Sequence, residues 1–460
     1  MEIRLHNTFS GNKEIFKPLK DGQVSMYNCG PTVYDYAHIG NLRAYVFADT
    51  LRRVFEYNDL NVNQVINVTD IGHLSSDSDD GEDKMTKALK REGKPMTLSA
   101  MREVADFYFE KFKEDLKALN IEVPEHFPFA SDHIKEDIEL VSKLEQGGFT
   151  YKTSDGIYFD IKKFPEYGKL GNIKISDDTE SRIGLNPEKR NSQDFALWKF
   201  SGKFNNELGY DAPFGKGFPG WHIECSAMSV KYLGPEFDIH TGGIDHIPVH
   251  HNNEIAQSVC AGDPYAKYWL HNAHLNIATE SGEDKMAKSG GNFITLNTLK
   301  ERKIDPLALR YVFLGARYSS PLTFSWETLE GAVTALNRIR QKVSKLPDGG
   351  VTAPTDFLKF VNDDLDTPKA LALISEVLNS ESISNADKKE TILNMDSVLG
   401  LELGRIINVV IPDEVLKLMQ ERDIARANKD FAKSDKLRNE IERVGFKVKD
   451  TESGTQLDLT

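Results

Sequence analysis

The sequence predicts an α/β protein that is built on a parallel sheet and continues into helices and a small basic module. Three observations carry this prediction: extended and helical patterns alternate over residues 1–120, a helical pattern takes over after residue 325, and positive charge gathers near the end of an acidic chain. Alternating strands and helices indicate βαβ units, whose strands run parallel. A chain of 460 residues also exceeds the roughly 250–300 residues that one hydrophobic core supports, so several domains are expected.

Three segments form the first βαβ unit. The pattern predicts a strand over residues 24–27, a helix over 42–57 and a second strand, rich in valine and isoleucine, over 62–68. Apolar stripes at helical spacing then predict two helices, over 104–116 and 134–144, which we expect to cover the sheet.

Changes in composition predict the remaining elements. Residues 151–216 are rich in Gly, Asn, Asp and Ser and are interpreted as an insertion, after which the sheet resumes near 237–239. An apolar stripe over 329–343 opens a helical bundle, and turn formers at 346–350 and 411–413 are the candidate linkers. The expected divisions are the first half of the sheet domain (1–120), helices and the insertion (121–216), the second half of the sheet domain (217–325), the helical bundle (326–405) and the C-terminal module (406–460).

Composition excludes a membrane protein and a disulfide-stapled one. No stretch reaches the roughly 20 apolar residues of a membrane helix, and the N-terminus has no apolar run typical of secretion. We therefore expect a cytoplasmic protein, and we expect a monomer. Three cysteines, Cys29, Cys225 and Cys260, are too few to staple so long a chain, so reduced thiols are available as metal ligands.

The charge distribution limits how nucleic acid could bind. A net charge of -14 argues against a protein that coats nucleic acid indiscriminately, because phosphates are attracted to a positive surface. Residues 417–449 carry ten Lys or Arg against six Asp or Glu, which makes this stretch positive. Any RNA contact is expected to be local and to include this segment.

A candidate phosphate site lies at residues 31–41, between the first predicted strand and the helix after it. This is the position at which nucleotide folds bind phosphate, because a helix N-terminus offers unpaired N–H groups there. Gly40 leaves space for a ligand against the backbone, and His38 and Asn41 add hydrogen-bond donors. A lone histidine at a helix start would be an ordinary structural feature.

A second candidate ATP motif is the lysine loop far downstream. Lys285 and Lys288 place two ammonium groups three residues apart, beside the glycine pair at 290–291. Such a loop can close over a triphosphate and neutralise the charge that develops as pyrophosphate leaves. The alternative is a solvated turn, and it is the two motifs together that predict an ATP site.

A candidate metal site is spread over distant segments. His250 and Glu254 are four residues apart and share a helix face, Cys225 can reach them from a neighbouring element, and Cys29 ends the first strand. Thiolate, imidazole and carboxylate ligands suit Zn²⁺. A structural zinc finger is disfavoured because fingers use closely spaced cysteine pairs.

These motifs resemble those of one enzyme family. The segments around His38 and Lys288 resemble the HIGH and KMSKS signatures of class I aminoacyl-tRNA synthetases, with Asn41 in place of the last histidine and Ala287 in place of the serine. Residues 27–35, 221–228 and 240–254 closely resemble cysteinyl-tRNA synthetases, and the resemblance runs over essentially the whole chain.

The resemblance implies a Rossmann-type catalytic domain, a helical bundle and a C-terminal anticodon-binding module. It implies activation of L-cysteine by ATP, accompanied by Mg²⁺, to cysteinyl adenylate, and transfer to tRNA(Cys) with release of AMP and diphosphate. His38 and Asn41 would contact phosphates, and Lys285 and Lys288 would close the loop. The implied zinc ligands, joined by the substrate thiolate, are Cys29, Cys225, His250 and Glu254. The implied cysteine-pocket residues are Thr69, Trp221 and His240.

Some features fit less directly. Residues 425–438 and 445–455 resemble the anticodon-binding module, but Gln456 and Leu457 stand where an aromatic residue is expected. An amphipathic helix with a solvated charged face is the alternative interpretation of this tail. His222, His246 and His251 border the ligands and could orient them.

Two other functions remain open at this point. One is a ligase of the same ancestry that joins cysteine to an amino sugar, as in the mycothiol pathway, and such an enzyme would lack an anticodon module. The other is a non-catalytic, zinc-stabilised RNA-binding protein, which would show no exchange of pyrophosphate into ATP.

Overall fold

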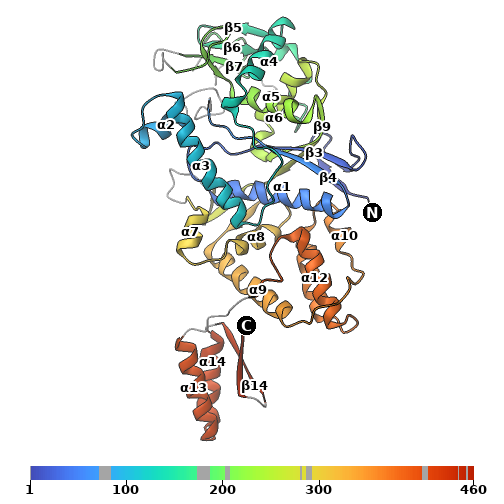
Figure 1. Ribbon diagram of the computed structural model, residues 1–460, viewed down its shortest axis with the longest axis vertical. Coiled ribbons are helices and arrows are strands. Elements are labelled where there is room, and N and C mark those ends of the chain that lie inside the picture. The colour runs from blue at the N-terminus through green and yellow to red at the C-terminus, as the bar shows by residue number, and fades with distance from the viewer. Residues whose placement is uncertain are drawn as a thin grey trace. The chain divides into compact units, whose positions relative to one another are not determined.

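The computed structural model describes most of the chain in two compact units (Figure 1). The described residues are 2–71, 84–173, 187–201, 208–279, 282–285, 293–406, 413–443, 445–451 and 454–459. The first unit comprises Met1–Thr298, Ala316–Thr323 and Leu358–Asp366, and the second comprises Leu299–Gly315, Phe324–Phe357 and Thr367–Thr460.

The first unit contains the predicted parallel sheet. Within the described residues, its strands stand in the order β10 (Tyr265–Asn272), β9 (Glu236–Gly243), β3 (Gln23–Asn28) and β4 (Asn61–Ile66), and each neighbouring pair is parallel. The order 10-9-3-4 means that the chain crosses over after β4 and returns beside β3. The α/β fold class and the first βαβ unit are thus confirmed.

The strand register brings distant residues to one edge. Tyr27 of β3 pairs with His240 of β9, and the N–H of Cys29 donates to the carbonyl of Thr241 over 3.1 Å. Ligands of open α/β sheets bind at the carboxyl ends of the strands, where these residues lie. The register therefore places Cys29 beside the end of β9, although the two are more than 200 residues apart in the sequence.

Helix α1 (Ile39–Tyr57) follows β3 and begins three residues earlier than predicted. His38 is its N-cap: the ring accepts from the N–H of Asn41 over 3.2 Å, and the Asn41 side chain accepts from the N–H of His38 over 3.3 Å. This reciprocal pair is a capping box, which satisfies N–H groups that a helix end leaves open. The same residues that carry the phosphate motif thus also start the helix.

Helices cover both faces of this sheet. Figure 1 shows α1 on one face, with α5 (Trp221–Leu233) and α6 (His250–Cys260) on the other. Tyr27, Val65, Phe237 and Trp269 are buried in the core between the sheet and these helices. Further helices of this half are α2 (Lys84–Arg91), α3 (Leu98–Ala118) and α4 (Ile134–Gln146).

The segment interpreted as an insertion contains an antiparallel sheet. Its described strands are β5 (Thr150–Lys152), β6 (Gly156–Phe159), β7 (Phe195–Phe200) and β8 (Gly217–Pro219), in that order. Phe159, Phe195 and Trp198 bury their rings against α4, α5 and α6, so the segment shares a core with the helices that carry the metal-site residues. The other strands here are β1 (Arg4–Asn7), β2 (Asn12–Ile15), β11 (Leu275–Thr279), β12 (Gly282–Lys285) and β13 (Leu322–Phe324).

The second half of the chain is helical, as predicted. Buried Arg340 connects segments of this helical half: its guanidinium forms an ion pair with Asp305 at 2.7 Å and donates to the carbonyl of Leu401 over 2.6 Å. The helices are α7 (Leu296–Glu301), α8 (Pro306–Leu314), α9 (Trp326–Ser344), α10 (Phe357–Val361), α11 (Thr367–Asn379) and α12 (Asn385–Leu399).

The C-terminal module combines two helices with a hairpin. Helices α13 (Asp413–Ala427) and α14 (Phe431–Arg443) precede the antiparallel strands β14 (Phe446–Thr451) and β15 (Gly454–Leu459). Val415, Ile441, Phe446 and Val448 form its small core. None of the helices among the described residues is long and apolar enough to cross a bilayer.

Candidate active site and metal centre

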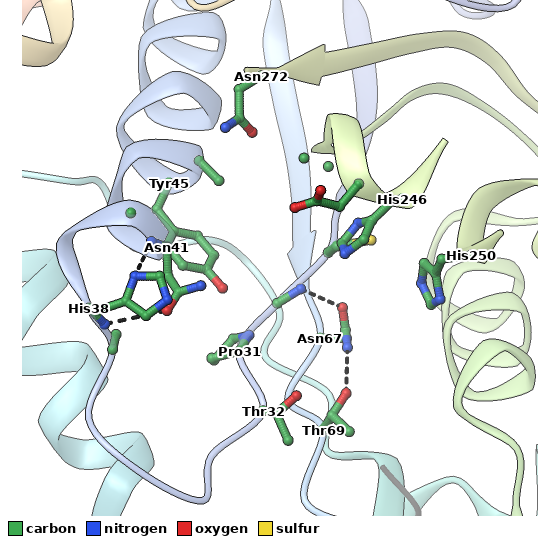
Figure 2. A pocket seen from close by; sticks show the side chains of 18 of the residues that line it. Pro31, Thr32, His38, Asn41, Tyr45, Asn67, Thr69, His246, His250 and Asn272 are labelled. Carbon is green, nitrogen blue, oxygen red and sulfur yellow. Dashed lines mark hydrogen bonds between the residues drawn. The ribbon is translucent and has the colours of Figure 1, made fainter. Parts of the chain in front are cut away.

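A pocket of about 770 Å³ opens at the carboxyl edge of the sheet (Figure 2). Its wall is formed by the loop from β3 into α1, the first turn of α1, the end of β9 and the starts of α5 and α6. Pockets of a few hundred cubic ångström suit small-molecule ligands. The lining residues that the sequence singled out are Cys29, His38, Gly40, Asn41, Thr69, Trp221, Cys225 and His250.

The phosphate corner is built by the capping box of α1. His38 and Asn41 are held in the pocket wall by the hydrogen bonds that they exchange, which Figure 2 shows as dashed lines. A Cβ on Gly40 would lie 3.0 Å from two atoms of the His38 ring, so a side chain there would press on the histidine. The α1 N-terminus therefore lies in a pocket wall that small residues keep open, with the N–H of Ile39 bonded to the carbonyl of Ile294 and that of Asn41 to His38.

The floor of the pocket depends on Asn67, which the sequence analysis did not single out. Its side chain accepts from the N–H of Gly30 over 2.7 Å and donates to the hydroxyl of Thr69 over 3.2 Å (Figure 2). A Cβ on Gly30 would lie 1.5 Å from the carbonyl oxygen of Asn67, so only glycine fits beside it. The predicted strand over 62–68 ends at Ile66, and the polar residues after it face the pocket.

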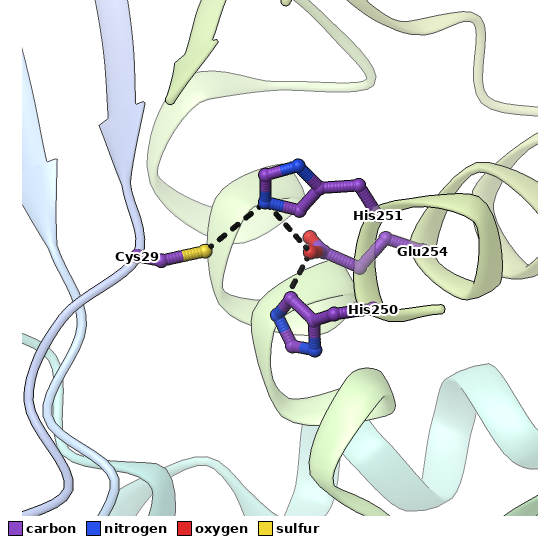
Figure 3. Close-up of side chains that lie close together, drawn as sticks. All are labelled: Cys29, His250, His251 and Glu254. Atoms are coloured by element: carbon purple, nitrogen blue, oxygen red, sulfur yellow. Dashed lines mark hydrogen bonds and ion pairs between the residues drawn. The ribbon is translucent and has the colours of Figure 1, made fainter. Parts of the chain in front are cut away.

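The candidate metal ligands converge beside this pocket (Figure 3). Ligand atoms of Cys29, His250, His251 and Glu254 all lie within 4.8 Å of one another. The Nε2 of His250 is 3.0 Å from Oε1 of Glu254, and the Nε2 of His251 is 3.3 Å from the Cys29 sulfur. The structure thus brings together three of the four predicted ligands and adds His251.

The fourth predicted ligand, Cys225, lies next to this group. Its thiol is within hydrogen-bonding range of Cys29 and His250, and it is fully buried on α5. The hydrogen bond with Cys29, together with burial, raises the pKa of the Cys225 thiol well above its ordinary value. The donor set around the site is therefore two sulfurs, two imidazoles and a carboxylate.

Buried neighbours hold the carboxylate of Glu254 in place. Its Oε2 accepts from the Tyr265 hydroxyl over 2.5 Å and lies 2.9 Å from Nε2 of His240. Burial alone would raise the pKa of Glu254, but His240 and His250 hold it well below its usual range. Glu254 is therefore ionised, with Oε1 pointing at His250.

His250 is charged by the same arrangement. Burial alone would lower its pKa, but Glu254 and Cys225 raise it to about 10. Its Nδ1 lies 2.8 Å from Nδ1 of His222, and the Trp221 ring stacks on its own ring at 4.4 Å between centroids. His222 and Trp221 therefore fix the orientation of His250, which matches the orienting role expected of His222.

His240 takes a different position from the other predicted pocket residues. It is fully buried, touches Glu254, and is not among the residues that line the pocket. Its ring stacks on Trp269 with centroids 4.6 Å apart. In this structure His240 can therefore act on the pocket only indirectly, through buried groups that it contacts, such as Glu254 and His251.

The lysine motif lies at the limit of the described chain. The backbone of Lys285 ends β12, where it pairs with Asn276 of β11. Lys288 and Ala287 lie outside the described residues.

The sequence offered His251 only as a residue that could orient the ligands, and it did not single out Tyr265 or Asn67. His251 is three residues before Glu254 and His250 is four before it, so both histidines share a helix face with the glutamate. This spacing in the sequence could have identified His251 as part of the metal site. Tyr265 and Asn67 carried no such pattern, because the pairing of β10 with β9 brings Tyr265 to the site and Asn67 directly follows the end of β4.

Comparisons with known proteins place the chain among tRNA synthetases. Residues 15–334 match the family described as the class I (C) tRNA synthetase catalytic domain, and residues 409–457 match the cysteinyl-tRNA ligase anticodon binding domain. Cysteine–tRNA ligase 1 of Burkholderia lata is 46% identical over 99% of this chain and 97% of its own. The cysteine–tRNA ligase of Treponema denticola is 40% identical over 98% of each chain.

Solved structures agree in fold at low identity. A methionyl-tRNA synthetase of Mycobacterium tuberculosis bound to methionyl adenylate has a TM-score of 0.54 at 14% identity and covers 82% of this chain and 90% of its own. A LeuRS of Agrobacterium radiobacter in a ternary complex with tRNA has a TM-score of 0.58 at 10% identity and covers 84% of each chain.

Proposed function

The chain belongs to the cysteine–tRNA ligase family of class I tRNA synthetases, and we propose that it activates L-cysteine with ATP and transfers it to tRNA(Cys), releasing AMP and diphosphate. The observation that carries the proposal is the common pocket wall: Cys29, at the metal centre, and His38, at the phosphate corner, lie on the same loop and line the same pocket. A cysteine bound by its sulfur at one place and a triphosphate bound at the other would have their reacting ends between them.

The metal centre suits Zn²⁺. Its donors are the thiol, imidazole and carboxylate groups that zinc prefers, and Cys29, Cys225, His250 and Glu254 are the proposed ligands. His250 Nε2 faces Glu254 Oε1 at 3.0 Å, as two ligands of one cation would, and a cation there would take the place of the imidazolium proton. When bound, Zn²⁺ supplies a Lewis acid that binds a thiolate firmly and a hydroxyl poorly, which separates cysteine from serine.

His251 is proposed to support the metal site rather than to complete it. Its Nδ1 is 2.7 Å from Nε2 of His271, whose Nδ1 is 2.8 Å from the hydroxyl of Thr8. Burial and the neighbouring histidines lower the pKa of His251 well below its ordinary value, so the ring is neutral. A neutral imidazole beside the Cys29 sulfur adds no charge that would oppose a cation.

Adenylation needs charge to be placed and neutralised more than it needs a nucleophile. The cysteine carboxylate attacks the α-phosphorus of ATP, and diphosphate leaves with the Mg²⁺ that accompanies it. We assign phosphate contacts to His38, Asn41 and the amides of the α1 N-terminus, and closure over the leaving group to Lys285 and Lys288. Thr69 and Trp221, which line the pocket, are assigned to the amino acid.

In the second step, the terminal ribose hydroxyl of tRNA attacks the carbonyl carbon of the adenylate and AMP leaves. The C-terminal module is proposed to bind the anticodon. There, Arg422 is buried against Asp450 at 2.9 Å, and Arg426 and Arg438 approach the same carboxylate at 2.9 and 3.1 Å. Asp423 also lies 3.8 Å from Arg422, so three arginines share two acids and leave positive charge for RNA. We further propose a cytoplasmic monomer, which light scattering after gel filtration tests.

Charging of tRNA tests the proposal directly. Purified protein with ATP and labelled cysteine should attach cysteine to tRNA(Cys) in a filter assay and should exchange pyrophosphate into ATP only when cysteine is present. Cysteine-dependent exchange without charging of tRNA would instead support the ligase that uses an amino sugar. A complete lack of exchange would favour the non-catalytic RNA-binding protein.

A further inference from the structure

An exposed tyrosine stands in the wall of the same pocket, two residues before His38. Tyr36 is 41% exposed, and it lines the pocket together with Tyr34, Lys84 and Tyr108. Neither the cysteine site nor the phosphate corner uses this ring. Single exposed apolar residues are common on proteins, so the argument depends on what holds Tyr36 and what surrounds it.

Buried neighbours fix Tyr36 in place. Its ring meets the Tyr108 ring edge to face, with centroids 5.3 Å apart and planes at 89°. Tyr108 is itself buried; its hydroxyl donates to Glu92 over 2.6 Å and accepts from Arg91 over 3.0 Å. An edge-to-face pair leaves other ring faces open to a third flat group.

Arg91 secures the loop that carries the tyrosine. Its guanidinium donates to the carbonyl of Tyr34 over 2.7 Å and to the carboxylates of Asp35 over 3.1 Å and Glu92 over 3.2 Å, and its side chain stays 42% exposed. The loop is thus tied to α2 on the residues just before Tyr36. A fixed aromatic ring costs less entropy on binding than a mobile one.

The basic side chains beside this ring belong to helix α2. It carries Lys84, Lys87, Lys90 and Arg91 and no acidic residue, although five acidic residues stand at 77–83, just before it in the sequence. Its apolar side chains are buried, so its basic ones face outward. A free nucleotide needs few such cations, whereas a nucleic acid strand that leaves the pocket would pass phosphates along the helix.

We propose that Tyr36 stacks on the terminal base of the tRNA acceptor end and that α2, through Arg91, faces the phosphates next to it. The proposal rests on the proposed function, because transfer requires the single-stranded acceptor end to enter this pocket. Unpaired bases are held by aromatic stacking and by cations along the backbone, which are the two features present here. Tyr36 is thus a positioning residue for the transfer step, with Tyr108 and Arg91 as its supports.

The test separates the two half-reactions. Tyr36→Ala should lower kcat/KM for tRNA on the order of tenfold, because base stacking on an aromatic ring is lost. Cysteine-dependent pyrophosphate exchange should stay within about twofold of wild type, since the ring contacts neither cysteine nor phosphate. Tyr36→Phe and Tyr36→Trp should restore charging, because both keep a stacking face. A merely structural role would not give this pattern of rescue with unchanged exchange.

Binding of shortened tRNA provides the second readout. Wild-type protein should bind full-length tRNA more tightly than tRNA that lacks the terminal adenosine, and Tyr36→Ala should bind the two equally. Phe107→Ala is the matched control for packing. Phe107 is a 48% exposed aromatic residue of α3 outside the pocket lining, and its ring, like that of Tyr36, meets Tyr108 edge to face, with centroids 5.1 Å apart. The variant removes a neighbour of Tyr108 but keeps the proposed stacking ring, so it should change neither step.

Three results would overturn the proposal. Tyr36→Ala could charge tRNA as well as wild type does. Its pyrophosphate exchange could fall in parallel with charging, which would assign the ring to the adenine of ATP. Phe107→Ala could lose as much charging activity as Tyr36→Ala does. If wild-type protein charges no tRNA at all, the proposed function itself fails, and that is seen before any variant is made.

Discussion

Removing the Tyr265 hydroxyl should weaken zinc binding although Tyr265 is not a proposed ligand. The hydroxyl donates to Oε2 of Glu254 over 2.5 Å and accepts from Ser229 over 3.0 Å, and all three residues are buried. Tyr265→Phe keeps the ring and its packing, so it creates no cavity. A hydrogen bond to a charged group contributes about 1.5–3 kcal/mol, and roughly 1.4 kcal/mol corresponds to a factor of ten in affinity.

The structure limits this loss. His240 remains 2.9 Å from the same carboxylate oxygen, so Glu254 keeps one of its two supports. We therefore expect zinc affinity to fall roughly 10- to 100-fold, the range in which groups that support metal ligands act. Competition with a chromophoric chelator at fixed pH measures the affinity, and elemental analysis gives the zinc content before competition.

A neighbouring tyrosine provides the control. Tyr268 lies on the same strand, but its hydroxyl accepts from the N–H of Lys17 over 3.1 Å, away from the metal ligands. Tyr268→Phe removes the same atom and should leave zinc affinity unchanged. The reasoning is refuted if Tyr265→Phe binds zinc within twofold of wild type, or if both variants lose affinity equally.

Three further outcomes follow from the site and the fold. Cys225→Ser should lose zinc and discriminate poorly against serine, because a hydroxyl is a poor zinc ligand; retained zinc by elemental analysis would remove Cys225 from the ligand set. Lys288→Ala should lower the adenylation rate roughly a hundredfold with little change in cysteine binding, as expected for a group that neutralises the leaving phosphates, and single-turnover kinetics with an unchanged rate would argue against that role. Burial raises the pKa of Asp70 from 3.8 to about 6, even though Ser131 donates hydrogen bonds to its carboxylate. The folded state therefore favours the protonated acid. The stability that protonated Asp70 contributes is fully present below pH 3.8 and is lost as the pH rises through about 6. Melting temperatures of Asp70→Asn should therefore depend less on pH between about pH 4 and 7 than those of wild type, and identical pH profiles would contradict the shifted pKa.

The sequence predicted the parts of the fold that depend on neighbouring residues. The strands around Val24 and Val62 and the helix between them follow from local periodicity, and each formed within three residues of its expected bounds. His250 and Glu254 were found together because four residues make one helical turn. The capping of α1 by His38 was not foreseen, although a structural histidine at a helix start was the alternative to a phosphate contact.

Strand register limited the prediction of the site. Tyr265 pairs with Glu236 in β9, and Tyr27 pairs with His240, so side chains far apart in sequence share one buried cluster. Register between distant parallel strands is set by the packing of the whole sheet and leaves no local pattern. The sequence could therefore name the proposed ligands but not the hydroxyl that holds Glu254.

Composition also concealed ordered structure. The segment rich in Gly, Asn and Asp forms most of the sheet β5 to β8, with β8 just beyond its predicted end, and its aromatic side chains provide a core that the polar average hides. At the C-terminus, buried Phe446 and Val448 alternate with lysines, a period of two that indicates a strand, although the segment was interpreted by its charge and its resemblance to the anticodon-binding module.

The central claim is that the metal centre selects cysteine. The most direct measurement is pyrophosphate exchange with cysteine and with serine as competing amino acids, on zinc-loaded protein, after removal of metal by a chelator, and after zinc is returned. We expect strong preference for cysteine in the loaded protein, loss of cysteine-dependent exchange on chelation, and recovery with zinc. Metal-depleted protein that still activates cysteine at the full rate, with the same preference over serine, would contradict it.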